Sequence, residues 1–126
     1  MTSNPLFILL CSGEREKLQM AAKIASLGAV SDRPVEVFVS MNAIQAFARG
    51  PVASAGPAAA GAEDAPDAAR LFRQGKEFGD LKIWACAMAL DVQGWEMENL
   101  VEDLFDGALG LTRFISDAER GQFITV

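Results

Sequence analysis

Short apolar runs alternate along this chain with longer stretches in which apolar residues recur every three or four positions. The run at residues 5–11 is continuously apolar, which is typical of a strand buried on both faces. A second run begins at Val35, directly after Pro34, and a third begins at Leu81. With two shorter runs, the predicted strands are 5–11, 35–39, 81–86, 105–107 and 122–126.

The stretches between these runs predict helices. In the first helix, an apolar stripe recurs at helical spacing, and we expect Ser12 to cap it and Gly28 to end it. That stripe consists of Leu18, Met20, Ala21, Ala22, Ile24, Ala25 and Leu27. The other predicted helices are 41–48 after Ser40, 67–79, 96–104 and 109–119, and a turn or helix begins at 87–91 and breaks at Gly94. In the last helix, the residues expected to face inward are Leu111, Phe114, Ile115 and Ala118.

Strands that alternate with helices of roughly 10–15 residues predict an α/β domain. We expect a three-layer α/β/α arrangement with a mainly parallel central sheet of about five strands. The 126 residues, 51% of them apolar, suffice for a single domain, 1–126, with one core. Residues 50–69 depart from the pattern, because fifteen of the twenty are Ala, Gly or Pro. We interpret them as an insertion at about 50–67 and expect it to be held in place, with another subunit as a candidate partner.

Charge and residue types exclude several functions. The net charge of -6 argues against a nucleic-acid partner, which needs a positive surface. The absence of His removes Ser-His-Asp and Cys-His catalysis and His metal ligation, and no metal or organic cofactor is suggested. No basic segment precedes the first apolar run, and no run reaches ~18 residues, so we expect neither a signal peptide nor a membrane span. Two Cys do not form a disulfide framework, and a cytoplasmic location is expected.

Cys86 is the main candidate for chemistry. It ends a predicted strand, and in open parallel sheets reactive groups lie beyond the carboxyl ends of the strands. The turn that follows offers unpaired N–H groups and the positive end of a helix dipole, which favour thiolate, the nucleophilic form of cysteine. The alternative is a buried thiol that packs as a small apolar side chain.

Other residues are expected near the same edge, namely Cys11, Ser12, Gly13, Ser40, Met41, Met88 and Asp91. Cys11 follows the same logic with less force, because acidic residues follow it. If their strands are neighbours, Cys11 and Cys86 can approach each other, and a disulfide would need Cα atoms within about 7 Å. Ser12 and Gly13 match neither the P-loop nor the dinucleotide fingerprint, which favours a helix cap. Asp91 is a general base, a cap or a solvated carboxylate, whereas Met88 is expected to pack.

Two segments of the chain resemble a known family. Lys82-Ile-Trp-Ala-Cys-Ala-Met-Ala-Leu-Asp-Val-Gln-Gly94 and Gly107-Ala-Leu-Gly-Leu-Thr-Arg-Phe114 are similar to the active-site region of the DsrE/DsrF-like sulfurtransferases. In that pattern a strand delivers a Cys, followed by Met, Asp and Gly, and a Gly-containing turn later enters the last long helix. The N-terminal half is also similar, in its first strand and turn, its first helix and its second strand. The likeness is greatest to the DsrE-like branch and spans nearly the whole chain apart from the Ala/Gly/Pro segment.

The resemblance implies a small cytoplasmic protein of flavodoxin- or Rossmann-like topology that passes sulfane sulfur as a persulfide on Cys86. It also implies a trimer or hexamer, with sulfur donor and acceptor proteins as partners. Such exchange needs an accessible, nucleophilic sulfur and no His. Two alternatives stay open, a non-catalytic oligomeric binding or scaffold subunit with Cys86 buried, and a thiol redox module using Cys11 and Cys86. For an oligomer interface, the candidates are Met41, Ile44 and Phe47 and the 50–69 segment.

Overall fold

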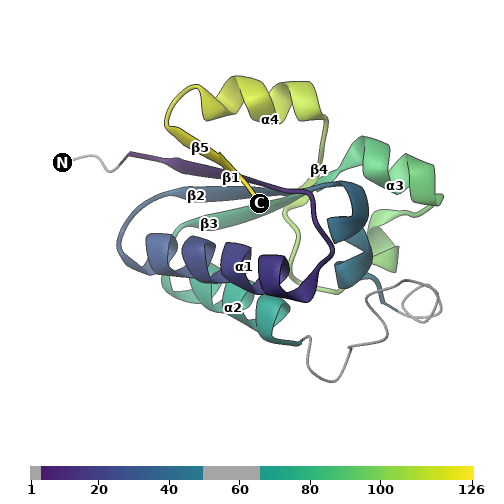
Figure 1. The fold of residues 1–126 in the computed structure, drawn as a ribbon, viewed down its shortest axis with the longest axis horizontal. Coiled ribbons are helices and arrows are strands. Elements are labelled where there is room, and N and C mark those ends of the chain that lie inside the picture. The colour runs from purple at the N-terminus through teal and green to yellow at the C-terminus, as the bar shows by residue number, and fades with distance from the viewer. Residues whose placement is uncertain (1–3, 50–65) are drawn as a thin grey trace.

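A five-stranded, all-parallel sheet in the order β4-β3-β2-β1-β5 organises the computed structural model, which describes residues 4–49 and 66–126 (Figure 1). The strands are β1 (Leu6–Leu10), β2 (Val35–Val39), β3 (Leu81–Cys86), β4 (Gly107–Leu109) and β5 (Gln122–Thr125). The helices are α1 (Arg15–Val30), α2 (Pro66–Phe78), α3 (Ala87–Gln93) and α4 (Leu111–Ala118), with the short 3₁₀ helices η1 (Met41–Phe47) and η4 (Met97–Asn99). The predicted α/β class with a parallel sheet of about five strands is confirmed.

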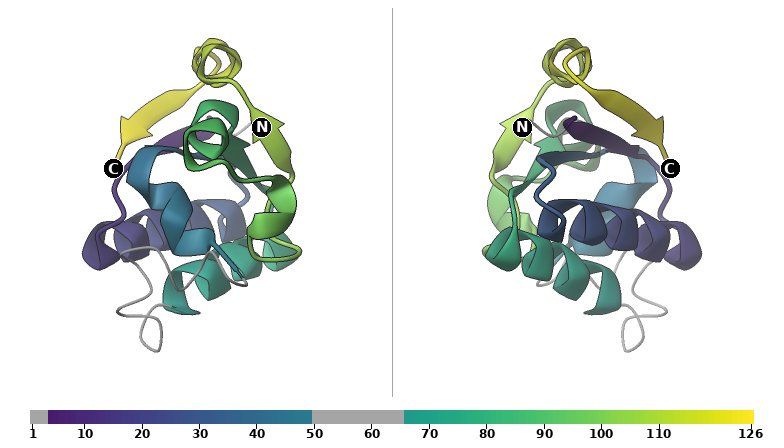
Figure 2. Two further views of the ribbon diagram at one scale, coloured as in Figure 1. Left: turned by 90° about the vertical axis from the view of Figure 1, so that its right-hand side faces the viewer. Right: turned by 90° about the vertical axis from the view of Figure 1, so that its left-hand side faces the viewer.

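The connections between strands place helices on both faces of the sheet. Helices α1 and α2 lie side by side on one face, whereas α4 covers the other and α3 leaves the carboxyl end of β3 on the α4 side (Figures 1 and 2). Right-handed crossovers account for the positions of α1, α2 and α4, because the steps from β1 to β3 move one way across the sheet and the step from β4 to β5 moves back. The sheet is doubly wound, as in flavodoxin, although its strand order differs from 2-1-3-4-5.

The three central strands, β1, β2 and β3, present a fully apolar and buried face to α1 and α2. The residues of this face are Leu6, Ile8, Leu10, Val35, Val37, Val39, Leu81, Ile83 and Ala85. Helix α1 meets them with Leu18 and with three small side chains, Ala21, Ala22 and Ala25, all of which are buried as predicted. Gly79, the residue after α2, lies close to the end of α1, where a Cβ atom would overlap the carbonyl of Ala29. These small residues let two helices share one face of a narrow sheet.

On the opposite face, α4 packs through one aromatic side chain. The Phe114 ring stacks on Phe38 with centroids 4.9 Å apart, and it meets the edge of Phe7 at 5.8 Å. Phe114 and Phe38 are both fully buried. Because side chains alternate along a strand, this contact assigns Phe7, Phe38 and their alternate neighbours to the α4 side.

The start and end of α1 differ from the prediction. Ser12 does not cap the helix; its Oγ accepts the N–H of Glu14 at 3.1 Å, and Glu14 itself occupies the N-cap position without a side-chain cap. Gly28 does not end the helix, which continues to Val30. A Cβ at Gly28 would lie 3.1 Å from the Val35 side chain, so this glycine serves close packing rather than termination.

The predicted helix 96–104 is wrong. Only the three residues of η4 are helical there, and Leu100 forms an isolated antiparallel bridge with Ala48. Leu100 and Leu104 are buried, but Asp103, at φ 60°, turns the chain between them. The fourth strand accordingly begins at Gly107, which is the last residue of the predicted strand 105–107.

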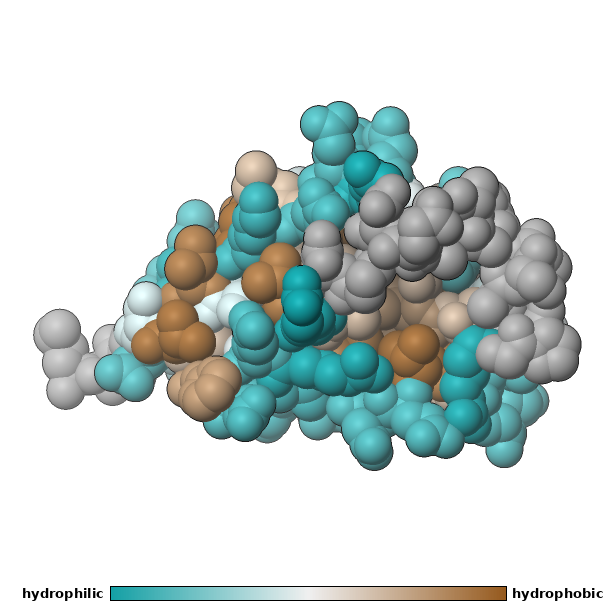
Figure 3. Space-filling model, turned by 90° about the horizontal axis from the view of Figure 1, so that it is seen from below, coloured by the Kyte–Doolittle hydropathy of each residue, from teal (hydrophilic) through white to brown (hydrophobic). Residues whose placement is uncertain are grey.

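Several residues of the predicted inward stripes are exposed, namely Met20, Leu27, Leu111 and Ile115. On the α1 and α2 side, apolar side chains gather toward the end of the molecule that holds the N-terminus (Figure 3).

The expected insertion at 50–67 lies outside the described residues, except that α2 begins with Pro66 and Asp67. Over the ranges that are described, no helix combines the length and the apolarity needed to cross a bilayer.

Candidate functional site

Cys11 and Cys86 lie at the carboxyl edge of the sheet, on either side of β2. Leu10 of β1 and Ala85 of β3 both pair with Val39, so each cysteine stands one residue beyond the same register position. Since Leu10 and Ala85 face α1 and α2, alternation directs both cysteines toward the α4 side. The two thiols therefore share one edge and one face of the sheet. The shared edge was predicted from the parallel arrangement of the strands.

Ser40 is the residue of β2 that stands between the two cysteines. It follows Val39 directly, is 9% exposed, and faces the same side as Cys11 and Cys86 by alternation. Its N–H donates to Leu10 O at 2.9 Å, which continues the β1–β2 ladder by one residue. Ser40 also precedes η1 as predicted, but its side chain makes no capping bond to that helix.

The sulfur of Cys86 is held at the start of α3. The Cys86 Sγ accepts the N–H of Ala89 at 3.4 Å, so one N–H of the first turn is satisfied by sulfur. A donor in this position stabilises negative charge on the sulfur. Cys86 is 5% exposed, however, so in the isolated chain few molecules can reach it directly.

Cys11 differs from Cys86 in access and in electrostatics. It is partly exposed, and its N–H donates to Val126 O at 3.0 Å, which keeps its backbone extended beside β5. Burial raises the pKa of the Cys11 thiol above its usual range, and a charge on Cys86 raises it further. Both causes disfavour the Cys11 thiolate, so Cys11 is mainly a protonated thiol at neutral pH.

The strands that carry the two cysteines are not neighbours, because β2 lies between β1 and β3. Adjacent strands are 4.7–4.9 Å apart, so two spacings place the Cα atoms of Cys11 and Cys86 about 9.5 Å apart. A disulfide needs Cα atoms within about 7 Å. A direct bond between Cys11 and Cys86 therefore requires the backbone to move.

The other predicted site residues surround these thiols unevenly. Gly13 packs against the turn after β2, where a Cβ atom would lie 2.9 Å from the O atom of Asn42, the residue that follows Met41. Met41 has a positive φ of 53° and is exposed.

On α3, Asp91 is exposed, and Met88, which was expected to pack, is 72% exposed instead. Of the predicted oligomer residues beside Met41, Ile44 and Phe47 are buried in the chain's own core, so they cannot form an interface.

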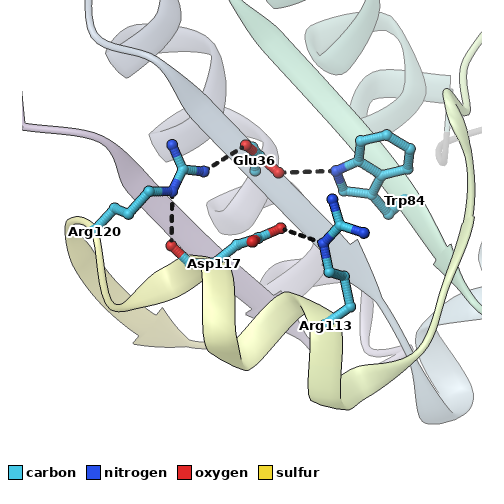
Figure 4. A network of polar contacts seen from close by, with 5 residues as sticks. All are labelled: Glu36, Trp84, Arg113, Asp117 and Arg120. Atoms are coloured by element: carbon cyan, nitrogen blue, oxygen red, sulfur yellow. Dashed lines mark hydrogen bonds and ion pairs between the residues drawn. The ribbon is translucent and has the colours of Figure 1, made fainter.

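The sequence analysis missed a polar network between α4 and the sheet (Figure 4). Glu36 Oε1 accepts from Trp84 Nε1 at 3.0 Å, and Glu36 Oε2 accepts from Arg120 Nη2 at 3.4 Å. Arg120 Nε also donates to Asp117 O, and Arg113 pairs with the Asp117 carboxylate at 3.2 Å. A single acidic residue inside the apolar run 35–39 was the available signal, since a charge there needs a partner.

No group of three or more His, Cys, Asp or Glu side chains is positioned to hold a metal ion within residues 4–49 and 66–126. The edge that carries Cys11, Ser40 and Cys86 thus offers two thiols and one hydroxyl. Without further groups, the two thiols can act as sulfur nucleophiles.

Comparison with known proteins supports the fold alone. No family model matches the sequence, and no curated protein matches it. Among solved structures, the chain is similar to a protein of unknown function, MTH1491 from Methanobacterium thermoautotrophicum, with a TM-score of 0.70 and 13% sequence identity. The match covers 98% of this chain and 100% of that one. The two proteins thus share an α/β fold over nearly their whole length.

Proposed function

We propose that this protein is a cytoplasmic sulfur carrier that accepts and passes sulfane sulfur as a persulfide on Cys86. The observation that carries the proposal is the position of the Cys86 sulfur, at the carboxyl edge of a parallel sheet with the Ala89 N–H donated to it. The resemblance of residues 82–94 and 107–114 to the DsrE/DsrF-like sulfurtransferases supports the same assignment.

The reaction needs no group beyond a thiolate. The Cys86 thiolate attacks the outer sulfur of a donor persulfide, R–S–S–H, and the donor's S–S bond breaks. The outer S–H group passes to Cys86, which becomes Cys–S–S–H, and the electron pair leaves on the donor's inner sulfur as R–S⁻, which takes a proton from water. An acceptor thiolate later attacks the outer sulfur in the same way and restores the Cys86 thiolate. Neither step consumes an oxidant or a reductant.

The test is the mass of each cysteine-containing peptide after the protein reacts with inorganic polysulfide and is capped with iodoacetamide. We expect the wild-type Cys86 peptide to gain one sulfur and the Cys86→Ser variant to gain none at that position. Circular dichroism of the variant checks that it is folded. Wild-type protein that never carries sulfur on Cys86 would contradict the proposal.

A second candidate function is a non-catalytic oligomeric subunit of the same fold, and the low exposure of Cys86 favours it. Both functions are compatible with a homo-oligomer, which we place on the α4 side of the sheet. There, large apolar side chains are exposed on α3, α4 and β5, namely Met88, Val92, Leu111, Ile115 and Phe123. Exposed apolar groups of this kind mark interaction surfaces.

Light scattering tests the oligomer. We expect a mass of three or six subunits, as the resemblance implies, and a smaller mass for Ile115→Lys on α4. Leu27→Lys is the matched control, because Leu27 is 66% exposed on α1, on the opposite side of the molecule. A monomeric wild type, or equal effects of the two variants, would remove this interface.

A further inference from the structure

Access to the two thiols at the sheet edge is unequal. Cys86 is 5% exposed, whereas Cys11 is partly exposed. A donor or acceptor protein must bring its own sulfur within bonding distance of the sulfur that it exchanges with. A macromolecular or bulky partner therefore meets Cys11 before it can meet Cys86.

The spacing of the two cysteines fits sulfur transfer better than disulfide formation. A disulfide spans Cα atoms up to about 7 Å apart, and one further S–S bond adds about 2 Å. Three sulfurs in line, as in the attack of one thiolate on the persulfide of another, therefore span about 9 Å. Two strand spacings place the Cα atoms of Cys11 and Cys86 about 9.5 Å apart. The gap is thus about 2.5 Å too wide for a disulfide but only about 0.5 Å wider than the longest span of a three-sulfur handover.

We propose that Cys11 is the exchange thiol through which sulfur enters and leaves Cys86, an inference that rests on the proposed function. In the loading step, the Cys11 thiolate attacks the outer sulfur of the donor persulfide R–S–S–H, the donor's S–S bond breaks, R–S⁻ leaves, and Cys11 becomes Cys–S–S–H. In the inward step, the Cys86 thiolate attacks the outer sulfur of this persulfide on Cys11. The S–S bond at Cys11 breaks, the electron pair leaves on the Cys11 sulfur, and that sulfur takes up a proton. The outward step is the reverse, and the number of electrons on sulfur is conserved in both.

The electrostatics of the pair favour storage on Cys86. Burial and the charge on Cys86 both raise the pKa of Cys11, so the departing Cys11 sulfur is held as a thiol. Only the thiolate fraction of Cys11 is nucleophilic, and because that fraction is small, both its loading by a donor and the return of sulfur from Cys86 are slow compared with the inward step. On Cys86, the Ala89 N–H donates to the sulfur that carries the persulfide.

Ser40 lies on the path between the two sulfurs. Its side chain is small and, by alternation, faces the same side as both cysteines, so Ser40 itself takes up little of the room between the two sulfurs. A branched apolar side chain at this position would fill that room while both thiols remain. Ser40→Val therefore tests the path between the sulfurs without removing either thiol, and Ser40→Ala is its control.

The experiment follows sulfur on each cysteine peptide over time, with glutathione persulfide as the donor and rapid capping with iodoacetamide. In the wild type we expect sulfur on Cys11 first and on Cys86 afterwards. In Cys11→Ser we expect loading of Cys86 to slow on the order of ten-fold or more, because the direct route is shielded. In Cys86→Ser, sulfur should accumulate on Cys11. In Ser40→Val, loading of Cys11 should be unchanged and loading of Cys86 slower, whereas Ser40→Ala should behave as the wild type.

Failure of the relay and failure of the carrier give different results. If Cys11→Ser loads Cys86 at the wild-type rate, Cys11 is not the exchange thiol, although Cys86 still carries sulfur. If no sulfur reaches Cys86 in the wild type, the carrier function itself fails. Should Cys11→Ser prove unfolded by circular dichroism, equal Cys86 loading in Ser40→Val and Ser40→Ala overturns the relay.

Discussion

The Trp84 indole Nε1 donates a hydrogen bond of 3.0 Å to Glu36 Oε1, from β3 to the neighbouring strand β2. The other Glu36 oxygen accepts from Arg120, which follows α4. Glu36 therefore connects the sheet to the short helix that covers it. Its side chain is only 19% exposed, so its hydrogen bonds are shielded in part from water.

Replacing Trp84 by Phe should destabilise the fold by about 1–3 kcal/mol, because the partly buried Glu36 oxygen loses its donor and part of the ring packing is lost. Urea unfolding measures the change. Arg113→Ala is the control, since the Arg113–Asp117 pair is exposed on the arginine side and such pairs contribute roughly 0.3–0.5 kcal/mol. Equal losses in the two variants would show that the Trp84–Glu36 hydrogen bond contributes no more to the free energy of unfolding than the exposed ion pair does.

Asp106 should be needed to join β4 to the sheet. Its Oδ2 accepts from the backbone N–H of Ile83 at 2.8 Å and from Lys76 Nζ at 2.5 Å. We expect Asp106→Ala to cost about 1–3 kcal/mol, because it leaves the Ile83 N–H without its acceptor. Asp106→Asn retains an oxygen acceptor and should lose less. Thermal unfolding of both variants distinguishes the two effects, and a reversed order would argue against this role.

Gly79→Ala should be among the most disruptive single-methyl changes in the chain. The new Cβ would overlap the Ala29 carbonyl, and neither backbone can give way without separating α1 from α2. We expect a loss greater than about 2 kcal/mol, as for other overpacked contacts. Gly110→Ala adds the same methyl where nothing lies within 4 Å, at a φ of -82°, and should cost less than about 1 kcal/mol, because Ala is a poorer N-cap of α4 than Gly. Denaturant midpoints compare the two directly.

The alkylation rate of Cys11 should rise with pH around a midpoint above the usual thiol range, because burial and Cys86 raise its pKa. Cys86→Ala should lower that midpoint by removing the second cause while leaving the first. The sign for stability follows. Between the unfolded-state pKa and the higher folded-state pKa, only the folded thiol keeps its proton, so the free energy of unfolding falls as pH rises. An unchanged midpoint in Cys86→Ala would mean that the two sulfurs do not interact.

The elements that could be predicted are those with dense apolar signals. Continuous runs defined β1, β2 and β3, and alanine spacing defined the buried stripe of α1. The segment after Glu96 was wrongly predicted to be a helix, because Met97, Leu100 and Leu104 fit a helical period while the positive φ of Asp103 breaks the helix. Local periodicity does not reveal such a turn. It also does not reveal how many residues of an apolar stripe become buried in the fold.

The candidate site was only half predictable. A parallel sheet with a cysteine after each of two strands places Cys11 and Cys86 at one edge whatever the strand order. The order itself is set by long-range pairing, which one sequence does not reveal. The intervening strand β2, and with it Ser40 between the thiols, therefore came from the structure.

The pairing of β1 with β5 has a consequence for how the chain is made. Strand β1 is synthesised first and β5 last among the strands, yet Leu6 through Leu9 pair with β5 along their whole length. During translation β1 can already pair with β2, but its other side presents unpaired N–H and C=O groups until β5 leaves the ribosome. Such an open edge is where a growing chain joins the wrong partner. Nascent chains stalled before β5 should therefore bind chaperones and resist compaction, even with β1 to β4 complete.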